Sequence, residues 1–154
     1  MKYGIDSEKG LYEEGNIYGD YIKEYIIKSL REMGHTVIDC GIKEGKNPGE
    51  NLFNKVIISN SNSIDLFISI KVIPHGENRA VIYIKNSDVG NIQEKFAENL
   101  KELDIFSIDV KEGDFFYLLK NIKATAMILE LYLDEGNYNK INDISNKILH
   151  SLCQ

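Results

Sequence analysis

The chain has 154 residues, of which 43% are hydrophobic and 27% are charged. This length and composition predict a single domain over residues 1–154 that buries one continuous core. The formal net charge of -6 and the pI of about 5.1 argue against a nucleic-acid or membrane partner, because both partners require a clustered positive surface.

We expect no export signal at the N-terminus, because residues 1–6 are mixed in polarity and charges follow them. No stretch reaches the roughly 18 apolar residues that a membrane-spanning helix needs. The two cysteines, Cys40 and Cys153, lie too far apart in the sequence for a disulfide framework or a CxxC metal site. We therefore expect a protein that is cytoplasmic as synthesised.

Strands and helices are predicted to alternate along the chain. In order, we expect a strand at residues 2–6, a loop at 7–15, a helix at 18–33, a strand at 35–40, a loop at 42–50, a helix at 50–61, a strand at 64–70, a loop at 72–78, a strand at 79–85, a helix at 91–103, short strands or turns at 105–110 and 115–120, a strand at 125–133 and a closing helix at 141–152.

Two of these elements have the clearest signals. Apolar side chains recur every three or four residues from Tyr18 to Met33, and Gly34 follows where a glycine commonly ends a helix. Apolar residues nearly fill "IDLFISI" at 64–70, which predicts a central strand covered on both faces. Lys71 is expected to end this strand.

The alternation predicts right-handed crossovers in a mainly parallel, twisted sheet with helices on both faces. The expected fold class is therefore α/β, with three αβα layers. Functional groups in such sheets gather at the carboxyl ends of the strands. The residues that follow Ile5, Ile70 and Leu129 are thus the candidates for a site.

Charged residues stand at these strand ends. Glu130 lies inside an apolar run, where a buried carboxylate is costly unless another group pairs with it, although an outward-facing Glu130 would be solvated. Lys71 follows the central strand, either as a site residue or simply as the strand end. Glu8 and Glu14 lie in the loop after the first strand, and His75 lies after the central strand, where it can face the same cleft. The sequence contains no i, i+4 histidine pair, no GxSxG elbow and no phosphate-binding glycine loop.

Four short motifs occur in order along nearly the whole chain. They are "IDSEKG" at 5–10, "GHTV" at 34–37, "DLFISIK" at 65–71 and "ILELYL" at 128–133. This series resembles the zinc-dependent N-acetylmuramoyl-L-alanine amidases, cell-wall hydrolases that include bacterial autolysins and clostridial phage endolysins. The resemblance implies an amidase-like, phosphorylase/hydrolase-like α/β fold.

The resemblance also implies where a zinc site would lie. The family holds zinc with three side chains, and the matching positions are Lys9, Gly15, which is next to Glu14, and Lys71. The family's catalytic glutamate matches Glu130. A protonated lysine has no lone pair for a metal, so the resemblance implies a degenerate member that binds no metal and needs no cofactor, where the family uses zinc. We hypothesise that Lys9 and Lys71 occupy the former metal site and pair with Glu130.

Three functions are compatible with these residues. The first is an amidase-like cell-wall pseudoenzyme that acts in binding or regulation, with a peptidoglycan stem peptide or a protein as its partner. The second is an active N-acetylmuramoyl-L-alanine amidase that cleaves the bond between muramic acid and the stem peptide through a displaced metal site of Glu8, Glu14 and His75. The third is a small α/β partner-binding domain unrelated to the cell wall. Without an export signal, contact with the wall would require lysis or a partner.

Overall fold

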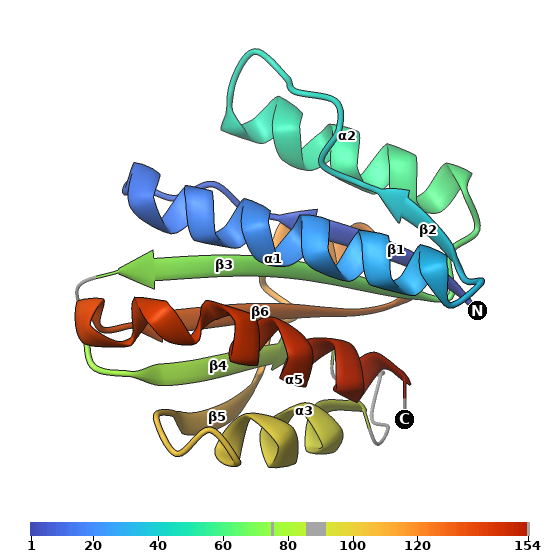
Figure 1. Cartoon of the computed structure of the whole chain (residues 1–154). Coiled ribbons are helices and arrows are strands. Elements are labelled where there is room, and N and C mark those ends of the chain that lie inside the picture. The colour runs from blue at the N-terminus through green and yellow to red at the C-terminus, as the bar shows by residue number, and fades with distance from the viewer. Residues whose placement is uncertain (75, 86–91, 154) are drawn as a thin grey trace.

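The computed structural model describes residues 1–74, 76–85 and 92–153, which form a six-stranded sheet between two layers of helices (Figure 1). The strands are β1 (Lys2–Ser7), β2 (Thr36–Asp39), β3 (Leu66–Pro74), β4 (Arg79–Ile84), β5 (Ser107–Glu112) and β6 (Thr125–Leu133). The helices are α1 (Glu13–Glu32), α2 (Pro48–Ser61), α3 (Ile92–Lys101), α4 (Tyr117–Asn121), the 3-10 helix η1 (Glu135–Lys140) and α5 (Ile141–Cys153). Among these described helices, none is long and apolar enough to cross a membrane.

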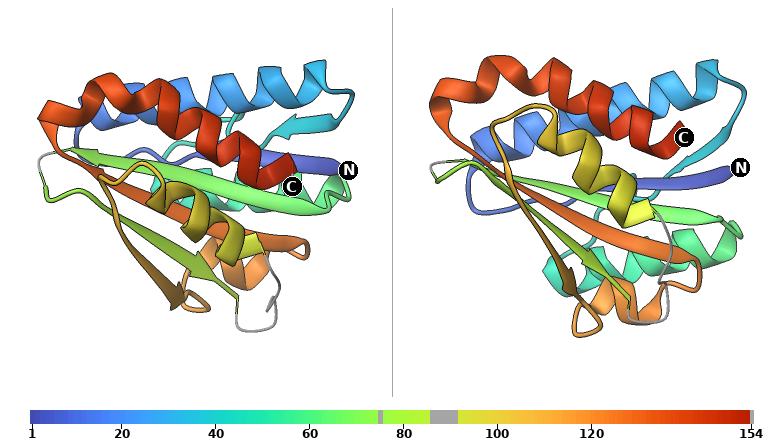
Figure 2. Two further views of the ribbon diagram at one scale, coloured as in Figure 1. Left: turned by 60° about the horizontal axis from the view of Figure 1, so that its bottom comes forward. Right: turned by 90° about the horizontal axis from the view of Figure 1, so that it is seen from below.

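The sheet is mainly parallel and has the strand order β2-β1-β3-β6-β4-β5. Strands β1, β2, β3 and β6 run in one direction. Strand β4 runs antiparallel to β6, and β5 runs parallel to β4. Helices α1, α3 and α5 cover one face, and α2 and α4 cover the other (Figure 2). The predicted three-layer α/β fold is therefore confirmed.

The central strands β3 and β6 each send alternate side chains to the two faces, as the pleat of a strand requires. From β3, Ile68 and Ile70 join the core under α1, whereas Phe67 joins the core under α2. From β6, Leu129 joins the core under α1 and Ile128 joins the core under α2. Ser69 and Glu130, which lie two positions after Phe67 and Ile128, must therefore also lie on the α2 face.

Two expected boundaries are wrong, and both involve site residues. Helix α1 begins at Glu13 instead of after Gly15, so the two acidic residues at its start lie in its first turn, where the helix N-terminus favours negative charge. Strand β3 continues to Pro74, so Lys71 lies inside the strand and not at its end. The added length is explained by pairing with β6, because the register continues from Lys71 opposite Glu130 to Pro74 opposite Leu133.

The segment at 115–120 was expected to be a short strand or turn, and this expectation is also wrong. Residues Tyr117–Asn121 form the short helix α4. Its consecutive residues Leu118 and Leu119 are both buried in the core under α2. Tertiary packing therefore decides the local conformation, since a helix of this length has little stability of its own.

The predicted end of α1 at Gly34 is confirmed in detail. Gly34 has a φ of +89°. Its amide donates to the carbonyl oxygen of Arg31 at 3.0 Å, and the amide of His35 donates to that of Leu30 at 3.0 Å. This is the Schellman arrangement, in which a left-handed residue satisfies the last carbonyls of the helix.

Gly34→Ala is expected to lower the free energy of unfolding by about 1 kcal/mol, because the left-handed conformation strains a side chain that has a Cβ atom. The cost is conformational, since no atom lies within 4 Å of the position that the Cβ would take. Urea unfolding measures the difference. Gly34→Asn serves as the control, with a smaller loss, because asparagine tolerates this conformation better. Equal stability of the alanine variant and the wild type would contradict the prediction.

Candidate functional site

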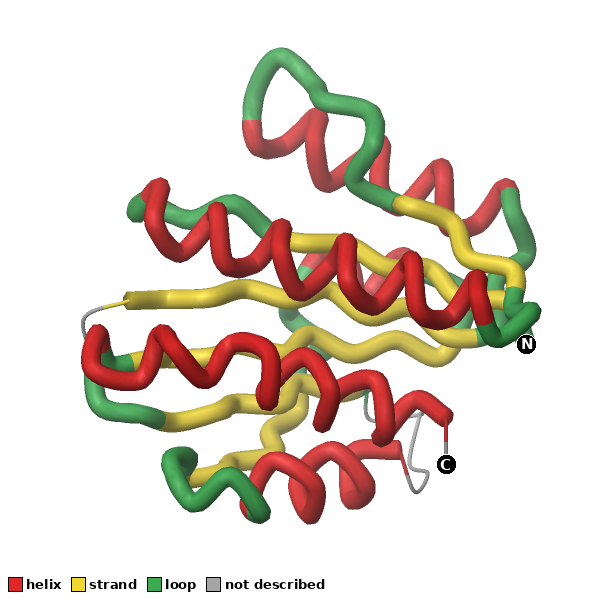
Figure 3. The backbone as a smooth tube through the Cα atoms, viewed as in Figure 1, coloured by secondary structure: helices red, strands yellow, loops and turns green. Residues whose placement is uncertain are grey.

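A row of polar side chains crosses the α2 face of the sheet near the carboxyl ends of β1, β3 and β6. The register places Asp6 of β1 opposite Ser69 of β3, and Lys71 of β3 opposite Glu130 of β6. Figure 3 shows that the loops after β1 and β2 lie at the same end of the sheet as the first turns of α1 and α2. The row therefore lies where functional groups gather in parallel sheets.

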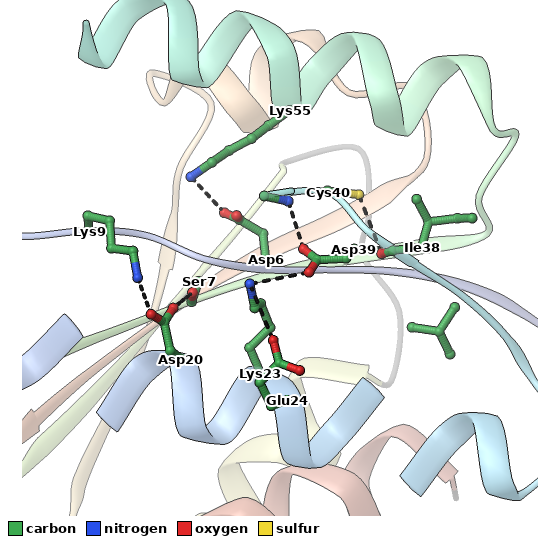
Figure 4. Close-up of polar contacts among 12 residues, drawn as sticks. Asp6, Ser7, Lys9, Asp20, Lys23, Glu24, Ile38, Asp39, Cys40 and Lys55 are labelled. Carbon is green, nitrogen blue, oxygen red and sulfur yellow. Dashed lines mark hydrogen bonds and ion pairs between the residues drawn. The ribbon is translucent and has the colours of Figure 1, made fainter. Parts of the chain in front are cut away.

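The inner end of the row is a buried ion pair between the sheet and α2 (Figure 4). Asp6 is fully buried, and its Oδ2 accepts a hydrogen bond from the Ser69 hydroxyl at 2.7 Å. The same oxygen lies 3.0 Å from Nζ of Lys55, a buried residue of α2. Oδ1 of Asp6 has no hydrogen-bond partner among the described residues. Since a buried carboxylate is costly without a countercharge, Lys55 is what makes Asp6 tolerable here.

A cavity of about 590 Å³ opens next to this pair. We call it the β1 cavity, because it lies between the end of β1, the β2–α2 loop and the N-terminus of α2. Its charged lining residues are Glu8, Lys9, Lys43, Glu44, Lys55 and Lys71. The lining therefore includes four lysines and two glutamates.

Glu8 extends the polar row beyond the last residue of β1. Its amide donates to the carbonyl oxygen of Ile70 at 2.8 Å, which fixes the backbone against β3. Burial raises the pKa of the Glu8 carboxyl above its ordinary value of 4.5. The ammonium groups of Lys71 and Lys55 oppose this shift, and the carboxylates of Asp6 and Glu130 add to it. The negative charge of Glu8 is thus only partly compensated.

Glu8→Gln is expected to raise the free energy of unfolding at about pH 7.5 more than at about pH 5. With a raised pKa in the folded state, the wild-type carboxyl stabilises the fold fully below 4.5, and this contribution is lost as the pH rises through the folded pKa. A neutral glutamine does not undergo this loss. Urea unfolding of both proteins at both pH values measures the effect, and an equal difference at the two pH values would contradict the prediction.

Lys71 is half-buried and lies over the turn that follows β1. A Cβ atom added to Gly10 would lie 3.1 Å from Cε and 3.9 Å from Nζ of Lys71. Lys71 forms no hydrogen bond or ion pair with another residue of the described chain. Its proposed pairing with Glu130 is therefore wrong in this structure, although the two residues are opposite each other in the sheet.

Lys9 points away from the polar row and toward α1 (Figure 4). Its ammonium pairs with Asp20 of α1, which also accepts a hydrogen bond from the Ser7 hydroxyl at 2.5 Å. Partial burial alone would raise the pKa of the Asp20 carboxyl. The hydrogen bonds from Lys9 and Ser7 and the charge of Lys9 outweigh burial and lower this pKa below its ordinary value. The hypothesis that Lys9 pairs with Glu130 is wrong, because α1 supplies a nearer carboxylate.

Gly15 lies in the first turn of α1 and is buried against β3. A Cβ atom there would lie 2.3 Å from the carbonyl oxygen of Val72 and 2.9 Å from Cδ of Pro74. The helix thus approaches the strand too closely for any side chain at this position. The neighbouring Glu14 is exposed, and His75 lies outside the described residues.

Glu130 is half-buried on the α2 face and lies near the Tyr83 side chain. Burial first, and then the charge and hydrogen bond of Glu130, raise the pKa of Tyr83. Asp6 was among the predicted candidates, as the residue that follows Ile5. The contributions of Lys55 and Tyr83 to the polar row were not predicted.

The comparisons with known proteins identify the fold. No family model and no curated protein sequence matches the chain. Among solved structures, the catalytic domain of the CD27L endolysin, which targets Clostridia difficile, has a TM-score of 0.78 and 18% identity over 99% of this chain and 97% of that one. The chain has the fold of the N-acetylmuramoyl-L-alanine amidases.

Other structures with the amidase fold match over nearly the whole chain. The CwlD amidase from Clostridioides difficile, solved in complex with the GerS lipoprotein, has a TM-score of 0.75 and 18% identity over 99% of this chain and 94% of that one. The amidase AmiC2 of Nostoc punctiforme has a TM-score of 0.71 and 14% identity over 99% and 95%. The resemblance in the four motifs is therefore a resemblance in the whole fold.

The residues at the implied zinc positions of the amidase fold do not fit zinc. Lys9 is paired with Asp20, Gly15 has no side chain and no space for one, and the ammonium of Lys71 offers no lone pair. Within residues 1–74, 76–85 and 92–153, no group of three His, Cys, Asp or Glu side chains is placed to hold a metal ion. The displaced set of Glu8, Glu14 and His75 includes a residue outside that part of the chain.

Proposed function

We propose that the chain is a non-catalytic protein with the amidase fold that binds peptidoglycan stem peptides instead of cleaving them. The observation that carries the proposal is the close approach of α1 to β3 at Gly15, where a Cβ atom would lie 2.3 Å from a backbone oxygen. Loss of a ligand side chain is reversible by one substitution, but here the space for that side chain is also filled. Lys9 and Lys71 stand at the other two implied ligand positions.

The remaining groups do not replace the chemistry that a metal supplies in a hydrolase. A catalytic zinc acidifies a bound water and polarises the scissile carbonyl. By the resemblance, Glu130 matches the catalytic glutamate of the family, but a carboxylate alone provides neither of these effects. What the site retains is a polar cavity at the carboxyl ends of the strands, which suits binding.

A protein partner is the second candidate, and one structural neighbour supports it. CwlD has the same fold and was solved in complex with the GerS lipoprotein. A regulatory role through a bound protein would likewise not require a metal. The stem peptide is preferred because the β1 cavity has the volume of a small-molecule site, about 590 Å³.

The test combines metal analysis, hydrolysis and binding on one preparation of the purified chain. We expect far less than one zinc per chain, no release of stem peptides from purified peptidoglycan, and co-sedimentation of the chain with that peptidoglycan. Glu130→Gln is the matched variant for the cleavage assay, because it removes the carboxylate that matches the catalytic glutamate of the family. The proposal fails if the wild type holds one zinc per chain and cleaves peptidoglycan, with cleavage lost on chelation and in Glu130→Gln. Absence of both cleavage and co-sedimentation would instead favour the protein partner.

A further inference from the structure

The charges of the β1 cavity are unequally satisfied. Of its four lysines, Lys9 pairs with Asp20 and Lys55 pairs with Asp6, both partners lying outside the cavity lining, and Lys43 is exposed to solvent. Lys71 is half-buried and has no hydrogen-bond or ion-pair partner among the described residues. The Glu8 carboxyl acts on this ammonium through its charge but forms no ion pair with it. An anionic group from a ligand that contacts the partly desolvated ammonium directly would therefore stabilise it.

The N-terminus of α2, which is capped by Asn47 and carries Glu50 in its first turn, also borders this cavity. Pro48 and Asn51, from the first turn of this helix of 14 residues, line the same cavity. A helix N-terminus carries a partial positive charge and favours anions. The Lys71 ammonium and the end of α2 therefore border the same space from the sheet and from the helix.

We propose that the β1 cavity binds a carboxylate of a mixed-charge peptide, and that the Lys71 ammonium is the group that receives it. The cation that the amidase fold would hold as a metal is replaced here by a side chain of the protein. This converts a position for a Lewis acid into a position for a counter-ion. The inference rests on the proposed function, because it specifies which chemistry of a stem peptide the chain recognises.

The other charges of the cavity select the kind of ligand. Glu8 and Glu44 also line it, and their carboxylates would repel a polyanion such as a phosphate chain. A ligand that carries both carboxylate and ammonium groups can match Lys71 and these two glutamates at once. The volume of about 590 Å³ is in the range that encloses a short peptide or another small ligand.

Calorimetric titration with three probes tests the proposal. The first probe is a tripeptide of alanine, glutamate and lysine with a free C-terminus. The second has glutamine for glutamate and a C-terminal amide, so that it carries no carboxylate. The third is inorganic phosphate. We expect the first probe to bind at least about tenfold more tightly than the other two, because a charge-assisted hydrogen bond is lost with the carboxylate.

Variants of Lys71 identify the receiving group. Lys71→Met should weaken binding of the first probe by about tenfold or more, and Lys71→Arg should keep it within about threefold, because the charge is retained. The control is Lys28→Met, which removes an exposed lysine from α1 on the opposite face and should not change binding. Thermal unfolding of each variant shows whether it is folded, and Lys71→Arg keeps the test decisive if the methionine variant is not.

Two results would overturn the inference. The first is equal binding of the tripeptide by the wild type and Lys71→Met, and the second is phosphate binding as tight as that of the tripeptide. Failure of the inference is distinguishable from failure of the proposed function. Co-sedimentation with peptidoglycan without tripeptide binding overturns only the inference, whereas zinc-dependent cleavage overturns the proposed function.

Discussion

Lys55→Met is expected to lower the free energy of unfolding by about 3–5 kcal/mol, the usual loss when one partner of a buried ion pair is removed. The substitution leaves the Asp6 carboxylate in a fully buried position with only the Ser69 hydroxyl as a partner. Methionine preserves most of the apolar stem that packs between α2 and the sheet. The loss of stability therefore measures the effect of removing the ammonium charge. Urea unfolding followed by circular dichroism measures it.

Two controls isolate the buried pair. In the double variant Lys55→Met/Asp6→Asn, much of the lost stability should return, because no charge remains buried without a partner. Lys9→Met should cost less than about 1 kcal/mol, because the Lys9 and Asp20 side chains are 52% and 43% exposed and water screens their interaction. Losses of similar size in Lys55→Met and Lys9→Met would show that burial of the pair has no special effect.

Gly15→Ala is expected to lower the free energy of unfolding by about 1–3 kcal/mol or more, the range for overpacking a well-packed contact. The new Cβ atom would meet the Val72 carbonyl oxygen at 2.3 Å, and backbone cannot rotate away as a side chain can. Helix α1 must then shift from β3. Urea unfolding measures the loss.

Gly19→Ala is the matched control, one turn further along the same helix. Its Cβ atom would lie 3.8 Å from Cβ of Ser7 and 4.0 Å from the carbonyl oxygen of Ile70, which are ordinary contacts. Alanine favours a helix over glycine by about 1 kcal/mol, so this variant should be as stable as the wild type or more stable. The close approach at Gly15 would be disproved if both alanine variants behaved alike.

The Gly15 contact also bears on restoring a metal site. Histidine at Lys9 and Lys71 changes two side chains that border open space, the β1 cavity. Glutamate at Gly15 requires that α1 first move from β3. The triple substitution is therefore expected to bind no stoichiometric zinc, as measured by metal analysis of the purified variant. One zinc per chain in a folded triple variant would contradict this expectation.

The fold could be predicted from the sequence because the decisive signals are local. Apolar periodicity and Gly34 define α1, and nearly continuous apolar runs define β3 and β6. The end of β3 could not be predicted in this way. Lys71 interrupts the apolar run, but the strand continues because β6 offers partners as far as Leu133 opposite Pro74. Strand length here depends on the neighbouring strand and not on the strand's own residues.

The candidate site was predictable in its place but not in its contacts. Lys71 and Glu130 could be placed near the carboxyl ends of their strands from sequence order alone, although both lie inside the strands. The partner of Lys9 is Asp20, which lies only 11 positions away but faces it across the turn into α1. The Asp6–Lys55 pair joins segments that are far apart in the sequence and depends on how α2 crosses the sheet. Such contacts require the tertiary arrangement.

The buried pair has a further consequence for how ligand binding would be felt by the rest of the protein. Lys55 anchors α2 to β1, and the first turn of the same helix forms a wall of the β1 cavity. A ligand in the cavity would therefore contact α2 at its N-terminal end, while the Asp6–Lys55 ion pair fixes the middle of the same helix to the sheet. Because linkage is reciprocal, occupancy of the cavity should slow amide hydrogen exchange along α2, and loosening α2 should weaken the ligand.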